Sequence, residues 1–469
     1  MSKSISSPPR RGSGGRDAPE IATFANAVRY LYDRVDIERM RVVRYDDKMF
    51  KLDRMRRLLK ALGSPHEQIR TVHVAGTLGK GSTVAMIASI LQGCGYGVGQ
   101  YTSPHLVDIR ERITINNQRI SKSDFIQLTR QVSAAAAKQP GEPTFFELFT
   151  AVAFKHFADQ AVDIAVIETG LGGRLDSTNV ITPEVTAITR IDYDHTHILG
   201  RTLTDIAREK AGIFKRGVPA LTVEQTAEVE KVLRDAAEKL AVGLRIVNKD
   251  IEFSCRFATS DALGPHTRVC VLTETSQFMH LPVPLAGDHQ AINCGLALAV
   301  IDSLKGAGFE FPEIPLHDGL AQSASPGRME LLWNQPRILA DGAHNPAALG
   351  ALMRCVGTFV PYDSMICIFG CCDDKDIPAM LDQLALGADK IIFTRAKGTP
   401  RAAEPRDLHR QFSERSGKMS QAAASLPKAL DLATQAVGRD DLICVTGSFY
   451  LVGEAKKHLT NLARKHQQP

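Results

Sequence analysis

The chain has 469 residues, of which 44% are hydrophobic and 23% are charged, a composition that is typical of a folded globular protein and excludes a largely disordered one. The formal net charge is +5, but residues 1–16 hold Lys3, Arg10, Arg11 and Arg16 and no acid, which leaves 5 − 4 = +1 for the rest. A nearly neutral body argues against a broad nucleic-acid-binding surface.

Residues 1–18 are rich in Ser, Gly, Pro and Arg and contain no apolar signal segment, so we expect a disordered tail. No run of about 18 apolar residues predicts a membrane span, and we expect a cytoplasmic protein without a membrane partner. Because the chain is longer than one hydrophobic core usually supports, we expect two domains.

After the tail, apolar runs with strand character alternate with segments of helical spacing. Helices are predicted at 25–32, 50–62, 121–137, 145–158 and 203–214, and strands at 71–75, 98–101, 162–168 and 185–191. Continuous apolar strands separated by helices favour a mainly parallel sheet covered on both faces, which defines an α/β fold. A segment of alternating strands over 245–271 precedes a further helix at 291–304.

A linker-like composition at 323–329 interrupts this pattern, and the α/β alternation then restarts. Further strands are predicted at 337–340, 365–369, 390–394 and 442–445, and a helix at 346–356. We therefore predict a nucleotide domain over 19–322 and a smaller doubly wound α/β domain over 330–469. A cleft between two such domains is a common substrate site.

Residues 71–91, TVHVAGTLGKGSTVAMIASIL, are the most informative segment. A β-branched run enters a glycine-rich turn that carries Lys80 and Ser82, and a helical pattern follows. Such a turn points backbone N–H groups and the positive end of the helix dipole at an anion, and the lysine neutralises phosphate charge. The spacing departs from G-x-x-x-x-G-K-[ST] because Gly81 separates the lysine from the serine. We interpret the segment as a nucleoside triphosphate site; the alternative is a plain glycine-rich turn.

Polar side chains follow the predicted strands of the first domain. Glu168 ends one strand, Ser103 follows a second, and His195 follows a third. Open α/β sheets bind ligands at such strand ends, and Mg²⁺ prefers a few protein oxygens together with phosphates and water. The residues alone favour a hydrogen-bonded loop histidine at His195 and a solvated helix charge at Lys210.

The second half offers further candidates near the predicted linker. Arg328 lies in this linker, where an arginine can bind a phosphate with two hydrogen bonds when domains close. Asp341 ends a strand and could accept a hydrogen bond from a nucleotide or an ammonium group. Asn345 is typical of a helix N-cap, an assignment that does not explain His344 beside it.

With these segments in order, the chain resembles the folylpolyglutamate synthase and dihydrofolate synthase family, within the Mur ligase superfamily, over about 24–454. The resemblance rests on the motifs VAGTLGKGST, YTSPHLVDIRERITIN, TFFELFTAVAF, VIETGLGGRLDSTNVI, ITRIDYDHTHILG, IAREKAGIFK, LAGDHQAIN, PGRMELL, LADGAHNP, GCCDDKD and VTGSFYLVGE. It implies an N-terminal P-loop ATPase domain and a C-terminal Rossmann-like domain, with the active site between them.

The resemblance also implies roles for individual residues. The phosphate loop falls on Gly79, Lys80, Gly81 and Ser82, and other nucleotide contacts fall on Asn293, Arg328 and Asp341. The implied metal ligands are Ser103, Glu168 and His195. The implied substrate contacts are Thr144, Phe145, Phe146 and Glu147 on the pterin side, and His344 and Ser448 toward the incoming glutamate. The implied catalytic residues are Lys80, His344 and Lys210, the last as a carbamate.

The implied reaction is ATP-dependent addition of L-glutamate to tetrahydrofolate or dihydropteroate through an acyl phosphate. ATP, one or two Mg²⁺ ions and a monovalent cation are the implied cofactors, and the expected protein is a monomer that acts on small molecules. The alternatives are a murein-precursor ligase of the same superfamily and a catalytically silent nucleotide-binding regulator. One departure from the usual GTNGKGS loop is Leu78, which replaces the asparagine.

Overall fold

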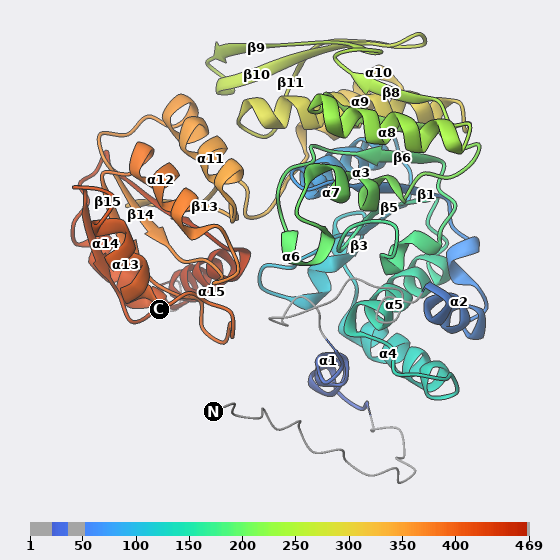
Figure 1. Ribbon diagram of the computed structural model, residues 1–469, viewed down its shortest axis with the longest axis horizontal. Helices are drawn as coiled ribbons and strands as arrows, with labels where there is room; N and C mark the ends of the chain where they lie inside the picture. The colour runs from blue at the N-terminus through green and yellow to red at the C-terminus, as the bar shows by residue number, and fades with distance from the viewer. Residues whose placement is uncertain (1–20, 36–51, 467–469) are drawn as a thin grey trace.

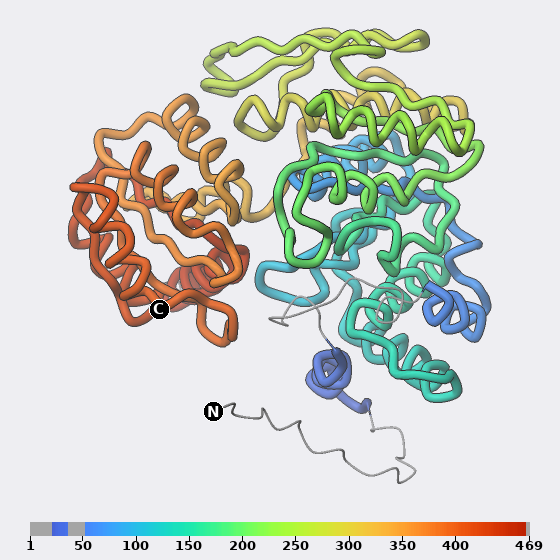
Figure 2. Tube along the Cα trace, viewed as in Figure 1, coloured from blue at the N-terminus to red at the C-terminus, as the bar shows by residue number. Residues whose placement is uncertain are grey.

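The computed structural model describes residues 21–35 and 52–466, so the predicted tail at 1–18 lies outside the described residues. Two α/β bodies lie side by side in Figure 1, one built around a large sheet and one around a smaller sheet. The chain passes from the first to the second after α10 (Glu313–Ala321), as Figure 2 shows. The predicted α/β class is confirmed. Within the described residues, no helix combines the length and the apolar character that a membrane span requires.

In the described part of the first body, eight strands form one sheet in the order β4-β3-β2-β5-β1-β6-β7-β8. Neighbouring strands in the run β2-β5-β1-β6-β7-β8 pair in parallel. At one edge of the sheet, β3 pairs antiparallel with β2, and β4 pairs antiparallel with β3. Their bounds are β1 (Thr71–Ala75), β2 (Val98–Tyr101), β3 (Ile113–Ile115), β4 (Gln118–Arg119), β5 (Ile164–Glu168), β6 (Val185–Ile188), β7 (Ala220–Val223) and β8 (Leu244–Val247).

Helices cover both faces of this sheet because successive strand residues point to opposite sides. On β5, Ile164 and Val166 pack into the core under α3 and α9, whereas Ala165 and Ile167 pack against α4 and α5. The helices are α1 (Phe24–Tyr32), α2 (Leu52–Ala61), α3 (Lys80–Gly93), α4 (Lys122–Ala137), α5 (Phe145–Asp159), α6 (Thr196–Leu199), α7 (Leu203–Ala211), α8 (Ala227–Lys239) and α9 (Asp288–Lys305). Helix α7 ends three residues earlier than predicted.

The segment predicted as alternating strands over 245–271 divides between two sheets: its first residues belong to β8 of the large sheet, and the rest forms most of an antiparallel sheet on top of α9 (Figure 1). Among the described residues it has three strands, β9 (Glu252–Ser260), β10 (Gly264–Leu272) and β11 (Gln277–Pro282), in the order β11-β10-β9. Val269, Val271, Phe278 and Leu281 face the core of the first body. Phe257 of β9 lies on this same face, paired with Thr267, but it is 54% exposed, and its ring contacts Phe359 of the second body, with ring centroids 5.6 Å apart.

The second body has six strands in its described residues, in the order β12-β13-β17-β14-β15-β16, and only β12 runs antiparallel to its neighbour. The strands are β12 (Glu330–Asn334), β13 (Arg337–Asp341), β14 (Met365–Phe369), β15 (Lys390–Phe393), β16 (Met419–Ala422) and β17 (Leu442–Thr446). One face is covered by α11 (Pro346–Phe359), α12 (Ile377–Gly387) and α13 (Pro405–Ser413), and the other by α14 (Leu426–Thr434) and α15 (Phe449–His466).

Candidate active site

A cavity of about 810 Å³ is lined by residues of both bodies. The loops after β1, β2, β5 and β6, which are neighbours in the large sheet, supply one wall. The loops after β13, β14 and β17, neighbours in the smaller sheet, supply the other. The carboxyl ends of parallel strands are where open α/β sheets place their ligands, so two such edges share one cavity.

The turn between β1 and α3 has the geometry of an anion cradle. Gly79 has φ 88°, a left-handed conformation, and a Cβ there would lie 2.3 Å from Asn293 Oδ1. Gly76 is equally constrained, since its Cβ would lie 1.8 Å from Thr189 Oγ1. The turn therefore requires glycine at both positions, and it presents the N-terminus of a helix of 14 residues to the cavity.

The predicted phosphate-loop residues divide between the cavity and the core. Gly79, Lys80 and Gly81 line the cavity, whereas Ser82 is buried, with its Oγ 3.5 Å from Ser325 Oγ. Asn293 lies beneath the loop against Gly79 and donates to Gln290 Oε1 at 3.0 Å.

Leu78 is not part of the described cavity lining, and its N–H donates to the Arg190 carbonyl at 3.1 Å. The loop is also held through Thr77, whose hydroxyl donates to the Asp192 carbonyl and accepts from the Asp192 N–H, at 3.0 and 3.1 Å. The shape of the loop is thus fixed largely by contacts that do not involve the Leu78 side chain.

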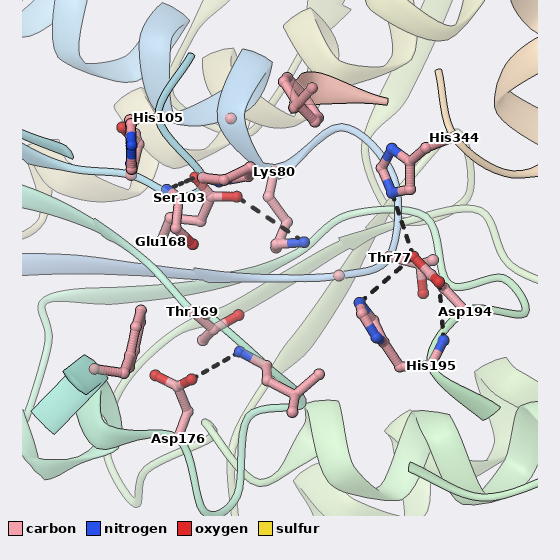
Figure 3. A pocket seen from close by; sticks show the side chains of 18 of the residues that line it. Thr77, Lys80, Ser103, His105, Glu168, Thr169, Asp176, Asp194, His195 and His344 are labelled. Carbon is pink, nitrogen blue, oxygen red and sulfur yellow. Dashed lines mark hydrogen bonds and ion pairs between the residues drawn. The ribbon is translucent and has the colours of Figure 1, made fainter. Parts of the chain in front are cut away.

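Glu168 is a buried carboxylate at the end of β5. Its Oε1 lies 3.9 Å from Lys80 Nζ, and its Oε2 accepts from the Ser103 N–H at 3.2 Å (Figure 3). Burial raises the pKa of Glu168, and Lys80, the Ser103 N–H, Arg328 and Arg112 oppose that rise. A further cation beside Glu168 would stabilise its ionised form.

The implied metal ligands are only partly grouped. Within the described residues, no group of three or more His, Cys, Asp or Glu side chains could hold an ion on its own. Ser103 and Glu168 are in contact, while His195 lies beside Asp194, on the other side of Lys80 in Figure 3. The buried Glu168 carboxylate, at the end of β5 and beside Lys80 of the phosphate loop, does fit Mg²⁺, which takes few protein oxygens when phosphates and water complete its shell.

Lys210 on α7 is 4% exposed and faces the cavity. Its Nζ donates to the Gly76 carbonyl at 2.7 Å. Burial, assisted by the charge of Lys80, lowers the pKa of Lys210 from 10.5 to about 7. The solvated-charge interpretation of this lysine is therefore wrong, and the side chain has access to its neutral amine near neutral pH.

Asp194 joins the two bodies. Its Oδ1 accepts from Lys375 Nζ at 2.6 Å, and its Oδ2 lies 3.5 Å from His344 Nε2 and 3.8 Å from His195 Nε2. Burial raises the pKa of Asp194, but His195, Lys375 and His344 outweigh burial and hold it well below its ordinary value. In the other direction, burial lowers the pKa of His195 to about 4 despite the attraction of Asp194.

The linker and the second body contribute three of the implied residues to the cavity, Arg328 from the linker and His344 and Ser448 from the second body. His344 Nδ1 lies 2.8 Å from the Gly342 carbonyl, which can only accept, so Nδ1 carries a proton and Nε2 faces Asp194. The Arg328 guanidinium lies over the Phe449 ring, 4.5 Å from its centroid. Asp341 is outside the described lining; it is buried and accepts from the N–H groups of Met329 and Ala343, which ties the linker to β13.

The pterin-side segment forms the N-terminus of α5. Thr144 and Glu147 make a capping box, and Glu147 also accepts two hydrogen bonds from Arg54 Nε, both at 2.9 Å. Thr144, Phe146 and Glu147 line the cavity, whereas Phe145 packs in the core, with its ring stacked on Tyr32 at 5.1 Å. The aromatic wall of the cavity on this side is therefore Phe146.

Reasoning from the sequence assigned no role to three cavity residues. Asp194 precedes His195 in the DYDH segment, Lys375 lies in GCCDDKD, and Arg54 lies on α2. Asp194 and Lys375 lie in motifs on which the family resemblance rests. That position is the signal that could have drawn attention to them. Nothing local marks Arg54, because its partner Glu147 lies 93 residues away.

Two α/β bodies, with a phosphate loop on one and a shared cavity between them, define a nucleotide-dependent ligase of the Mur ligase type. The Mur ligase middle domain family matches residues 74–301, and the Mur ligase glutamate ligase domain family matches residues 327–449. The dihydrofolate synthase/folylpolyglutamate synthase of Bacillus subtilis is 36% identical over 415 residues, covering 87% of this chain and 94% of that protein. The chain belongs to the dihydrofolate synthase/folylpolyglutamate synthase family.

Solved structures agree with this assignment. The Mycobacterium tuberculosis folylpolyglutamate synthase complexed with ADP superimposes with a TM-score of 0.85 at 30% identity, covering 94% of this chain and 99% of that one. E. coli FolC in complex with DHPP and ADP gives a TM-score of 0.82 at 28% identity, covering 95% of this chain and 100% of that one.

Proposed function

We propose that this chain is an ATP-dependent ligase that adds L-glutamate to a folate acceptor, extending the chain of tetrahydrofolate and also accepting dihydropteroate. The observation that carries the proposal is the arrangement of the shared cavity. Lys80 and Glu168 at the phosphate loop belong to the same cavity as His344 and Ser448 of the second body. The named activity of the relatives and the solved structures of related enzymes with ADP and DHPP support the same reaction.

In the proposed reaction, a carboxylate of the acceptor attacks the γ-phosphate of ATP and forms an acyl phosphate with release of ADP. The amine of glutamate then attacks the acyl carbon, phosphate leaves, and the amine loses a proton. Lys80 neutralises charge on the transferred group, and Arg328 supplies a second cation from the linker. Positioning and charge stabilisation of this kind provide most of the catalysis in phosphoryl transfer.

Ser103 and Glu168 would hold Mg²⁺ with the phosphates of ATP, and His195 would join them only after leaving Asp194. When bound, Mg²⁺ would supply positive charge to the phosphate oxygens. A carbamate on Lys210 would place an anion close to the phosphate loop. The monovalent cation, the monomeric state and the cytoplasmic location stay predictions of the family resemblance.

The test offers dihydropteroate and tetrahydrofolate separately to the purified protein, with ATP and labelled glutamate, and identifies the products by mass. The expected result is one added glutamate on dihydropteroate and one or more on tetrahydrofolate, with equal amounts of ADP and new amide bonds. A silent nucleotide-binding regulator would show no substrate-stimulated ADP release. Turnover only with a UDP-sugar peptide would favour the murein-precursor ligase.

A further inference from the structure

A second cavity, of about 330 Å³, adjoins the active-site cavity. The two share four lining residues, His105, Leu106, Arg401 and Tyr450. His105 is labelled in Figure 3, beyond Ser103 as seen from Lys80. A ligand in the active-site cavity can therefore extend into the second one, which we call the side cavity.

The walls of the side cavity are fixed by contacts between the two bodies. A Cβ on Gly453 of α15 would lie 1.9 Å from the Leu106 carbonyl oxygen, so this loop of the first body touches the α15 backbone. Opposite it, the Lys397 N–H donates to Glu454 Oε2 at 2.7 Å and ties the loop after β15 to α15. The side cavity is thus a built feature of the assembled chain.

The side cavity carries an excess of positive charge. Lys397, Arg401 and Lys457 line it, against a single acid, Glu454. Arg401 is paired with Asp374 at 3.1 Å. The exposed side chains of Lys397 and Lys457 have no ion-pair partner among the described residues. An anionic ligand is what these two lysines can bind without losing an existing contact.

The side cavity also leads away from the reaction centre along one helix. Tyr450, Glu454 and Lys457 lie at spacings of four and three on α15, and therefore on one face. Helix α15 begins directly after Ser448, which lines the active-site cavity near the proposed glutamate site. Lys457 comes nine residues later, about 14 Å along the axis at the usual helical rise.

We propose that the side cavity binds the α-carboxylates of a γ-glutamyl chain on the folate acceptor. The inference rests on the proposed function. Each γ-linked glutamate keeps a free α-carboxylate, so a growing chain is a row of anions, and the basic side cavity adjoins the cavity in which the chain is extended. Dihydropteroate has only the carboxylate that is activated and so presents no anion to Lys397 or Lys457.

The test compares acceptors of different chain length in the full-length protein. The double variant Lys397→Ala/Lys457→Ala removes the two unpaired cations, and Lys239→Ala/Lys428→Ala, two exposed lysines on α8 and α14, is the matched control. For each protein, kcat/KM is measured with the mono- and triglutamate forms of tetrahydrofolate at low and high ionic strength. Circular dichroism and thermal unfolding establish that each variant is folded.

In the side-cavity variant, we expect the ratio of kcat/KM for triglutamate to that for monoglutamate to fall about five- to tenfold. A fall of this size is expected when two solvent-exposed charge contacts are lost. In the control variant, the ratio should stay at the wild-type value. The wild-type ratio should also fall with added salt. An unchanged ratio in the side-cavity variant would overturn the inference, as would a wild-type protein that uses dihydropteroate but not folylglutamates. A wild-type protein that adds glutamate to no acceptor would overturn the proposed function as well.

Discussion

Lys210 gives the sharpest prediction. Its buried environment lowers the pKa of its amine, and the proposed carbamate depends on that lowered pKa. A pKa of about 7 leaves about three quarters of the side chain as neutral amine at pH 7.5, whereas a pKa of 10.5 would leave about one part in a thousand. Only the neutral amine reacts with carbon dioxide to give a carbamate. Burial therefore raises the reactive fraction several hundredfold.

We expect Lys210→Ala to lower kcat/KM by at least 100-fold, and acetate or formate to restore part of it by placing a carboxylate in the vacated space. Wild-type activity should fall as pH drops below 7, because the amine becomes protonated. The folded-state pKa is lowered, so the cost of burying the charge is fully present below pH 7 and lost toward pH 10.5. Lys210→Met should accordingly be most stabilising, relative to wild type, in acid.

Lys215→Ala is the matched control. Lys215 is half-buried, burial lowers its pKa too, and its Nζ donates to the Asn179 carbonyl at 3.2 Å, but it lies outside the described lining of the cavity. Its variant should keep activity. Initial rates with and without bicarbonate, and ¹³C NMR after labelling with ¹³C-bicarbonate, measure the carbamate directly. Full activity of Lys210→Ala without an added carboxylate, or no carbamate signal in wild type, would refute the reasoning.

Three further predictions concern the same cavity. Glu168→Gln should abolish ligation, yet raise the midpoint of thermal unfolding at pH 7.5, because the raised folded pKa means that the ionised carboxylate costs stability above its titration range; a midpoint below that of wild type would contradict this. Asp194→Asn should lower kcat/KM for glutamate about 10- to 100-fold, and Lys375→Met should lower it by a similar factor. The double variant should lose no more than either single variant, since each change breaks the same contact. Additive losses in the double-mutant cycle would exclude the coupling. Leu78→Asn should change the KM for ATP less than threefold, as measured by ADP release, because other groups hold the loop; a tenfold change would show that this side chain reaches the nucleotide.

The sequence predicted the strands of the two parallel sheets well because their signal is local. The run at 71–75 is apolar at nearly every position, and the structure has β1 over those residues, buried throughout. β7 was missed although it is buried throughout, and its run of four residues is short. β12 and β16 were missed because they lie at sheet edges, where half-exposed residues such as Glu330 and Ser420 weaken the apolar pattern.

The site was predictable in its motifs and not in its contacts. Lys80, Glu168 and Ser103 follow from strand ends that the sequence marks. The state of Lys210 does not, since its burial depends on α7 packing against a loop 134 residues away. Likewise, the contact of Asp194 with Lys375 spans 181 residues and exists only once both bodies are assembled.

The contact between Asp194 and Lys375 bears on why the site is divided between two bodies. A buried ion pair is seldom more stabilising than an apolar pair of the same size, because both charges lose hydration. Apolar contacts already join the bodies, where Leu106 packs against the core of the second body and where Phe257 contacts Phe359. The ion pair between Asp194 and Lys375 differs from these apolar contacts because it lines the reaction cavity. Its charged groups are directed at the place where carboxylate substrates must be held and where water must be excluded from an acyl phosphate. Its position therefore indicates that it serves the chemistry more than the stability of the fold.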